Sequence, residues 1–218
     1  MKWLDAVLDL LFPPKCPFCG KVTERTGVCE ACERSLPRVP DADTVKTEKG
    51  LAVAAPLYYR GAVRDGVLRF KFGGESGCAR ALGPLLAQCA AERFSGEFDA
   101  VTWAPVSRKR LRRRGYDQAK LLAEAACASW GIRPTALLKK IADNPAQSTL
   151  RGESARRANV LGVYEPTNIE RIRGARVLLV DDVYTTGATV RECERVLRDA
   201  GAADVMCVCL ARAEAENS

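Results

Sequence analysis

Two aspartates followed by a turn rich in threonine have the types and spacing most suited to chemistry in this sequence. The run Arg176 to Val180 (RVLLV) leads into Asp181 and Asp182, and then into the segment 184–189 (YTTGAT). Free N–H groups of a turn that enters a helix bind phosphate, and threonine hydroxyls add hydrogen bonds. Two carboxylates would repel a neighbouring phosphate unless they bind a sugar diol or a metal ion. The pattern therefore predicts a site for a phosphorylated ribose with Mg²⁺ nearby.

Two other classes of protein also carry an apolar strand that ends in two acidic residues. In receiver domains these acids belong to the first strand of the domain, whereas Asp181 and Asp182 lie late in this chain. A Walker B strand requires a GxxxxGK[ST] loop, which the sequence lacks. A purely structural turn is the remaining alternative.

Four of the ten cysteines form two CxxC pairs with nine residues between them: Cys16 and Cys19, then Cys29 and Cys32. Each pair can hold one side of a tetrahedral ion, so the four thiolates predict a structural zinc site with no open position for chemistry. A dithiol redox motif is the alternative, and two pairs this close together outside a βαβ unit argue against it. We expect the other six cysteines to be core residues.

Positive charge is concentrated in one part of the chain. Residues 101–160 contain 13 Lys or Arg and 4 Asp or Glu, a net charge of +9 within a chain whose total is +7. Six cations lie between a predicted strand and a predicted helix, so we expect them on a loop at the ligand edge of the sheet. They are Arg108, Lys109, Arg110, Arg112, Arg113 and Arg114.

Three interpretations of this basic loop remain open. A pyrophosphate with its magnesium would be received by Arg108, Arg110, Arg112 and Arg114, because arginine matches phosphate oxygens. A nucleic-acid backbone would be bound by Lys109, Arg110, Arg112, Arg113 and Arg114, with a steep dependence on salt. An ordinary solvated surface is the third interpretation.

The absence of histidine excludes several classes of mechanism. The chain can have no Ser-His-Asp or Cys-His catalysis, no histidine-bound metal and no imidazole proton shuttle. Ten cysteines without a recognisable signal peptide indicate a reducing compartment, so we expect a cytoplasmic protein. Apolar residues at helical spacing over 1–12 predict a helix that packs on its own protein, or touches a membrane surface or partner. This helix is too short to span a bilayer.

The elements that must position these residues alternate along the chain. Strands are predicted over 51–59, 98–106, 135–141, 176–180 and 204–210, and most of them are separated by apolar stripes of helical period. This alternation predicts an α/β domain with a parallel sheet flanked by helices. We expect three parts: a helix and four-cysteine module over 1–36, a polar linker over 37–50 and the α/β domain over 51–218. Residues 143–160 are polar and irregular.

The segment VDDVYTTGAT resembles the PRPP-binding loop of the type I phosphoribosyltransferases, where PRPP is 5-phosphoribosyl-1-pyrophosphate. The resemblance implies that fold, with Asp181 and Asp182 as catalytic residues that contact the ribose hydroxyls. It also implies that the 5′-phosphate is held by Thr185, Thr186, Gly187, Ala188 and Thr189. If the protein turns over, a nucleophile displaces pyrophosphate at ribose C1.

Nearly the whole chain resembles the ComF family. The resemblance rests on the N-terminal helix, the CxxC pairs, segments 59–61 (YRG) and 70–72 (FKF), segments 105–119 and 147–159, and the PRPP loop. It implies a cytoplasmic protein linked to DNA uptake in natural competence, which binds PRPP with Mg²⁺. Single-stranded DNA and proteins of the competence machinery are its implied partners.

Two details of this resemblance bear on function. Asp117 stands where the family's RGxNQ-like pattern has Asn, which adds a negative charge beside the expected pyrophosphate loop. Residues 143–160 correspond to the mobile hood that closes over the site in the family. Alternatives to an enzyme are a non-catalytic module that binds single-stranded DNA, and a regulator whose affinity for DNA depends on PRPP.

Overall fold

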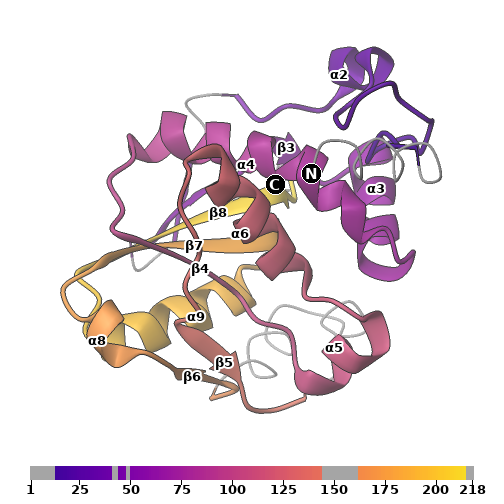
Figure 1. Ribbon diagram of the computed structural model, residues 1–218. Helices are drawn as coiled ribbons and strands as arrows, with labels where there is room; N and C mark the ends of the chain where they lie inside the picture. Colours follow the sequence, from indigo (N-terminus) through magenta and orange to yellow (C-terminus); the bar gives the residue numbers. More distant parts are fainter. Residues whose placement is uncertain (1–12, 41–43, 48–49, 144–161, 215–218) are drawn as a thin grey trace.

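The computed structural model describes residues 13–40, 44–47, 50–143 and 162–214, which form a mixed α/β domain with a small cysteine module packed beside it (Figure 1). The helix predicted over 1–12 and nearly all of the predicted hood lie outside the described residues. The described helices are α2 (Glu30–Ser35), α3 (Gly61–Phe72), α4 (Ala79–Phe94), α5 (Arg108–Arg114), α6 (Gln118–Ser129), α8 (Ile169–Ile172) and α9 (Ala188–Asp199), with a 3₁₀ turn at Ser76–Cys78.

The main sheet contains the strands that were predicted to position the aspartates. Its order is β1-β2-β8-β7-β4, and β3 pairs with β8 beyond the end of β2. All neighbours are parallel except β1 and β2. The strands are β1 (Val45–Lys46), β2 (Ala52–Ala54), β3 (Leu57–Tyr58), β4 (Ala100–Trp103), β7 (Arg176–Tyr184) and β8 (Asp204–Arg212).

Alternate residues of the central strands serve two separate hydrophobic cores. On β7, Leu178 and Val180 pack with α3, α4 and α6, whereas Val177 and Leu179 pack with α9 on the opposite face. Helices therefore cover both faces of the sheet, as expected for parallel strands whose residues are buried on both sides (Figure 1). The six cysteines outside the CxxC pairs are all buried, which confirms the prediction that they are core residues.

Several predicted elements differ from the structure. The strand predicted over 51–59 is interrupted at Pro56, which has no N–H to offer to β8, and so it becomes β2 and β3. The strand predicted over 135–141 shortens to β5 (Leu138–Lys140). It pairs with β6 (Tyr164–Pro166) in a separate antiparallel sheet. The polar segment 37–50 contributes edge strand β1.

The loop predicted for the basic segment is wrong, because residues 108–114 form helix α5. The Ser107 hydroxyl accepts a hydrogen bond from the Arg110 N–H at 3.3 Å and caps the start of the helix. Gly115 ends the helix in a left-handed conformation, with φ of 81°. In the described part of the chain, no helix is long and apolar enough to cross a membrane.

Candidate functional site

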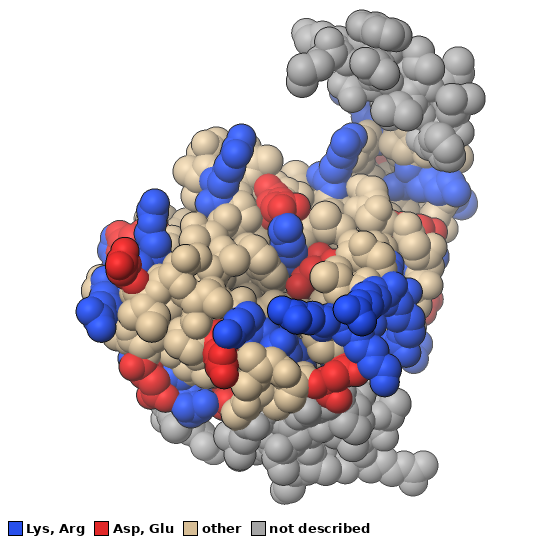
Figure 2. All heavy atoms as spheres, turned by 60° about the horizontal axis from the view of Figure 1, so that its bottom comes forward, with Lys and Arg blue, Asp and Glu red and all other residues tan. Residues whose placement is uncertain are grey.

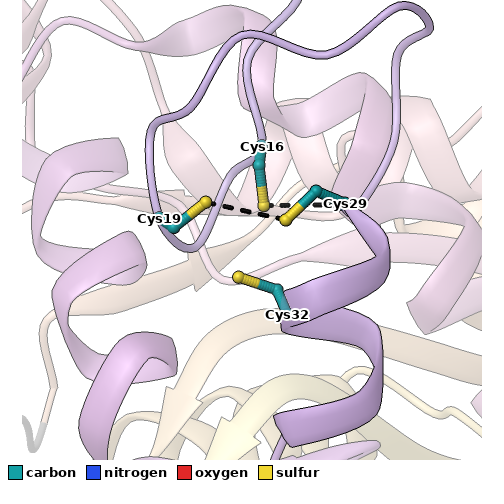
Figure 3. Close-up of side chains that lie close together, drawn as sticks. All are labelled: Cys16, Cys19, Cys29 and Cys32. Carbon is teal, nitrogen blue, oxygen red and sulfur yellow. Dashed lines mark hydrogen bonds between the residues drawn. The ribbon is translucent and has the colours of Figure 1, made fainter.

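The four predicted zinc ligands converge at one point of the cysteine module (Figure 3). Their Sγ atoms all lie within 4.8 Å of one another, and Cys19 and Cys29 are 3.7 Å apart. Zinc–sulfur bonds in a tetrahedral site place the sulfurs about 3.8 Å apart. Cys16 and Cys19 lie on a turn closed by a hydrogen bond from the Gly20 N–H to the Cys16 carbonyl. The donor set and its spacing fit a structural zinc ion.

The surroundings of Cys16 favour its thiolate form. Burial works against the charge, but backbone N–H groups of Cys29, Cys19 and Phe18 point at the sulfur and outweigh that effect, so the pKa falls to about 7. The Cys29 N–H lies 3.5 Å from the Cys16 Sγ. A thiolate at neutral pH is the form that binds zinc.

The two aspartates lie on opposite faces of β7, inside the strand and not beyond its end as predicted. Asp181 continues the row of Val177 and Leu179, and pairs in register with Cys209 of β8. The Asp182 carboxylate lies on the other face, where its Oδ1 is 2.9 Å from the Lys71 Nζ of α3. The Asp182 backbone N–H donates to the Asp181 Oδ1 at 2.8 Å, which orients the Asp181 carboxyl.

The Asp181 carboxyl is held in its neutral form at pH 7. Burial, followed by repulsion from Asp182, raises the pKa of Asp181 to about 8, although Lys71 opposes the shift. It interacts electrostatically with groups from six surrounding segments: Lys71 of α3, Asp117 at the start of α6, Lys140 of β5, Tyr164 of β6, Cys193 of α9 and Cys209 of β8. The charge of Asp182 thus favours the protonated form of Asp181.

The turn after β7 has the features expected of a phosphate cradle. Gly187 has φ of 70°, and a Cβ there would lie 2.6 Å from the Tyr184 ring, so only glycine fits. Helix α9 begins directly afterwards with Ala188, and its first N–H groups have no partner within the helix. The Thr186 Oγ1 atom is buried and has no hydrogen-bond partner among the described residues. Thr185 is exposed.

Helix α5 divides the basic segment into two faces. Arg110 and Arg114, one turn apart, are partly buried, whereas Arg108, Lys109, Arg112 and Arg113 are exposed. Arg114 donates to the Gln118 Oε1 at 2.9 Å, and its guanidinium lies 4.8 Å from the centre of the Phe72 ring. Burial lowers the pKa of Arg114, while the charge of Asp182 opposes that change. Figure 2 shows a dense group of Lys and Arg side chains on this face of the molecule.

Two residues at the site have roles that the motifs did not reveal. Lys71 is the counter-charge of Asp182, and attraction to the acids raises its pKa despite burial. Asp117 caps α6, since its carboxylate accepts from the Lys120 N–H at 3.2 Å and from the Val106 N–H at 3.0 Å. Burial raises the pKa of Asp117 against these two hydrogen bonds. The segment FKF was the only sequence signal for Lys71.

Two family models match the chain. The phosphoribosyl transferase domain matches residues 113–218, and the double zinc ribbon domain matches residues 7–42. The first match contains β7, the phosphate turn and α9, and the second contains the four converging cysteines. The domain matches thus confirm the predicted fold and the structural zinc site.

Similar proteins cover most of the chain. Competence protein ComFC of Streptococcus pneumoniae is 27% identical over 208 residues, which are 95% of this chain and 85% of the relative. DNA utilization protein YhgH of Salmonella typhimurium is 31% identical over 207 residues, 90% of this chain and 83% of the relative. Among solved structures, a PRPP amidotransferase from B. subtilis is 22% identical, with a TM-score of 0.43 over 66% of this chain and 30% of that chain. The family of this chain therefore rests on the two sequence relatives and not on the structural likeness.

Proposed function

The chain belongs to the ComF family, which includes the ComFC competence proteins and the YhgH DNA utilization proteins, and we propose that it binds PRPP with magnesium in a DNA-uptake role. One observation carries the proposal. The buried Thr186 hydroxyl, which has no hydrogen-bond partner among the described residues, and the N-terminus of α9 lie directly after the aspartate pair. An anion site and a pair of diol acceptors are therefore adjacent.

Each part of PRPP has a matching part of the site. The 5′-phosphate lies at residues 185–189, and the ribose hydroxyls face Asp181 and Asp182. The pyrophosphate, which carries the magnesium, meets the inner face of α5 at Arg110 and Arg114. Arg108 and Arg112, which the sequence assigned to the same ligand, lie on the exposed face of that helix, and their contact with pyrophosphate stays a prediction.

Calorimetric titration with PRPP and Mg²⁺ tests this proposal. The double variant Asp181→Ala/Asp182→Ala should lose detectable binding and keep the circular dichroism spectrum of the folded protein. The matched control is Asp204→Ala, which removes an acid at the opposite end of the neighbouring strand β8. Unchanged affinity in the double variant would sink the proposal.

The same site is suited to transfer as well as to binding. Attack by a nucleophile at ribose C1 forms one bond while the bond from C1 to the pyrophosphate oxygen breaks, and pyrophosphate leaves with its magnesium. This chain would contribute positioning and charge, with Asp181 and Asp182 on the ribose and Arg110 and Arg114 on the leaving group. Release of pyrophosphate on incubation with PRPP, Mg²⁺ and cell extract distinguishes an enzyme from a binder.

A second function, binding of single-stranded DNA, is favoured by the outer face of α5. This face presents four exposed cations, Arg108, Lys109, Arg112 and Arg113. Phe72, which is 59% exposed, lies under the Arg114 guanidinium of the other face. An exposed ring beside a cation is suited to stacking a base while other cations hold the backbone. The four exposed cations are not the ones that we assign to pyrophosphate, so the two ligands are compatible.

The salt dependence of DNA binding tests this second function. Each phosphate contact on single-stranded DNA contributes about 0.7 to the slope of log affinity against log salt. The variant Arg112→Glu/Arg113→Glu should therefore reduce the slope by about 1.4 or more. Arg80→Glu, on the exposed surface of α4, is the control. An unaltered slope in the double variant would exclude the outer face of α5 as the contact.

A further inference from the structure

The cysteine module is fixed to helix α3 by direct contacts with its backbone. The Arg69 guanidinium donates to the carbonyls of Pro17, at 3.1 Å, and Phe18, at 2.6 Å. Both acceptors lie between the first two zinc ligands. A Cβ placed on Gly66 would lie 2.5 Å from the Pro17 carbonyl oxygen, so the turn that carries Cys16 and Cys19 packs against bare helix backbone.

The far end of the same helix reaches the candidate PRPP site. Lys71, in its last turn, forms the 2.9 Å ion pair with Asp182, and both side chains are mostly buried, at 20% and 15% exposure. The Phe70 carbonyl accepts a hydrogen bond from the Tyr116 hydroxyl, and the two rings lie 5.9 Å apart. The last turn of α3 is thereby fixed against the segment that joins α5 to α6.

Helix α3 can couple the cysteine module to Asp182, because the helix is continuous between the two contacts. Gly66 and Lys71 are separated by about 7.5 Å along the axis, little more than one turn. Four metal ligands cross-link the cysteine turn to α2, so the surface presented to α3 is rigid when zinc is bound. We therefore expect a displacement of the module at Gly66 to change the position of the Lys71 amine relative to Asp182.

We propose that the four-cysteine module positions Lys71 against Asp182 through α3, and thereby holds the aspartate pair in the arrangement that receives ribose. Lys71 is a positioning residue in this scheme, since it acts on PRPP through Asp182. The inference rests on the proposed PRPP site for its functional consequence. The mechanical link itself involves only contacts between described residues.

Substitution of Gly66 tests the link in the zinc-loaded, full-length protein. Gly66→Ala places a methyl group against the Pro17 carbonyl, whereas Gly27→Ala, in the same module, meets no heavy atom within 4 Å. The first measurement is the rate at which an amine-reactive ester labels Lys71, followed by peptide mass spectrometry. Labelling should be at least about tenfold faster in Gly66→Ala than in the wild type and unchanged in Gly27→Ala, because a freed amine is exposed. Both variants should retain their zinc.

The second measurement is PRPP affinity by calorimetry. Gly66→Ala and Lys71→Met should each weaken binding about tenfold, and the double variant should be no weaker than Lys71→Met alone, since both act through one contact. Lys71→Arg should restore part of the affinity, which a purely structural role would not predict. Should Gly66→Ala fold poorly, Arg69→Gln removes the two hydrogen bonds to the module without adding volume.

The outcomes separate this inference from the proposed function. Faster labelling of Lys71 in a protein that never binds PRPP would support the link and refute the PRPP site. Unchanged labelling in both Gly66→Ala and Arg69→Gln would overturn the link, whatever PRPP does. Additive losses of affinity in the double variant would likewise overturn it, because the module and Lys71 would then act independently.

Discussion

Binding of PRPP should release a proton from Asp181. With a pKa of about 8, raised first by burial and then by the charge of Asp182, this carboxyl is about 90% protonated at pH 7 in the free protein. Hydrogen bonds donated by the ribose hydroxyls favour its ionised form, which has only acceptor oxygens. We therefore expect release of about 0.9 proton per PRPP at pH 7 and about 0.1 at pH 9.

The same ionisation should govern affinity. The competent fraction rises from about 9% at pH 7 to about 91% at pH 9, so the apparent dissociation constant should fall about tenfold across that range. The sign follows from a pKa raised in the free protein: affinity is lost as the pH falls below 8. PRPP phosphates titrate near pH 6 and contribute little above pH 7.

Calorimetry in buffers with different ionisation enthalpies measures the released protons directly. Asp181→Asn, which preserves the shape of the side chain, is the matched control and should release none. A wild-type protein that releases no proton at pH 7 and binds equally well at pH 7 and pH 9 would refute this reasoning, because Asp181 would then bind PRPP in the state it already has.

Three further results are expected. Cys16→Ser should reduce the zinc content from one ion per chain to near zero by atomic absorption, whereas Cys127→Ser, in the core, should keep it; equal zinc in both would contradict the four-cysteine site. Gly187→Ala and Gly174→Ala each force a side chain into a left-handed conformation and should cost about 1 kcal/mol or more in denaturant unfolding. Only Gly187→Ala also collides with Tyr184, so it alone should abolish PRPP binding. Asp117→Asn should lower the pH at which PRPP affinity is half-maximal, because the charge of Asp117 helps to raise the pKa of Asp181; an unmoved midpoint would show that its charge does not reach Asp181.

The zinc ligands and the phosphate turn could be predicted because their geometry is local. A pair of cysteines on one turn, or a strand that leads through Gly187 into a helix, defines its own site within a few residues. The periodicity of apolar residues also gave the parallel sheet and its helices. The pairing of β5 with β6, by contrast, depends on contacts between segments far apart in the sequence, which no local pattern encodes.

The Lys71–Asp182 ion pair shows the same limit at the level of the site. Lys71 carries no special spacing relative to the aspartates, and it reaches Asp182 through the tertiary packing of α3 on the sheet and on the cysteine module. The sequence could show that the acids needed a partner to offset their repulsion. The sequence predicted a sugar diol or a metal as that partner, and the structure pairs Asp182 with a lysine.

In the basic segment, the capping residues predict the structure better than the charge does. Ser107 before the run and Gly115 after it are an ordinary N-cap and C-cap, and they predict a helix of two turns. Once the segment is a helix, its six cations no longer act together: Arg110 and Arg114 are partly buried and the other four are exposed to solvent. A net charge of +9 therefore overstates the field around the aspartate pair, where Lys71 is already ion-paired with Asp182 and Asp117 adds a further acidic group. Four of the six cations of α5 lie on the exposed surface, which is suited to a second, different anion.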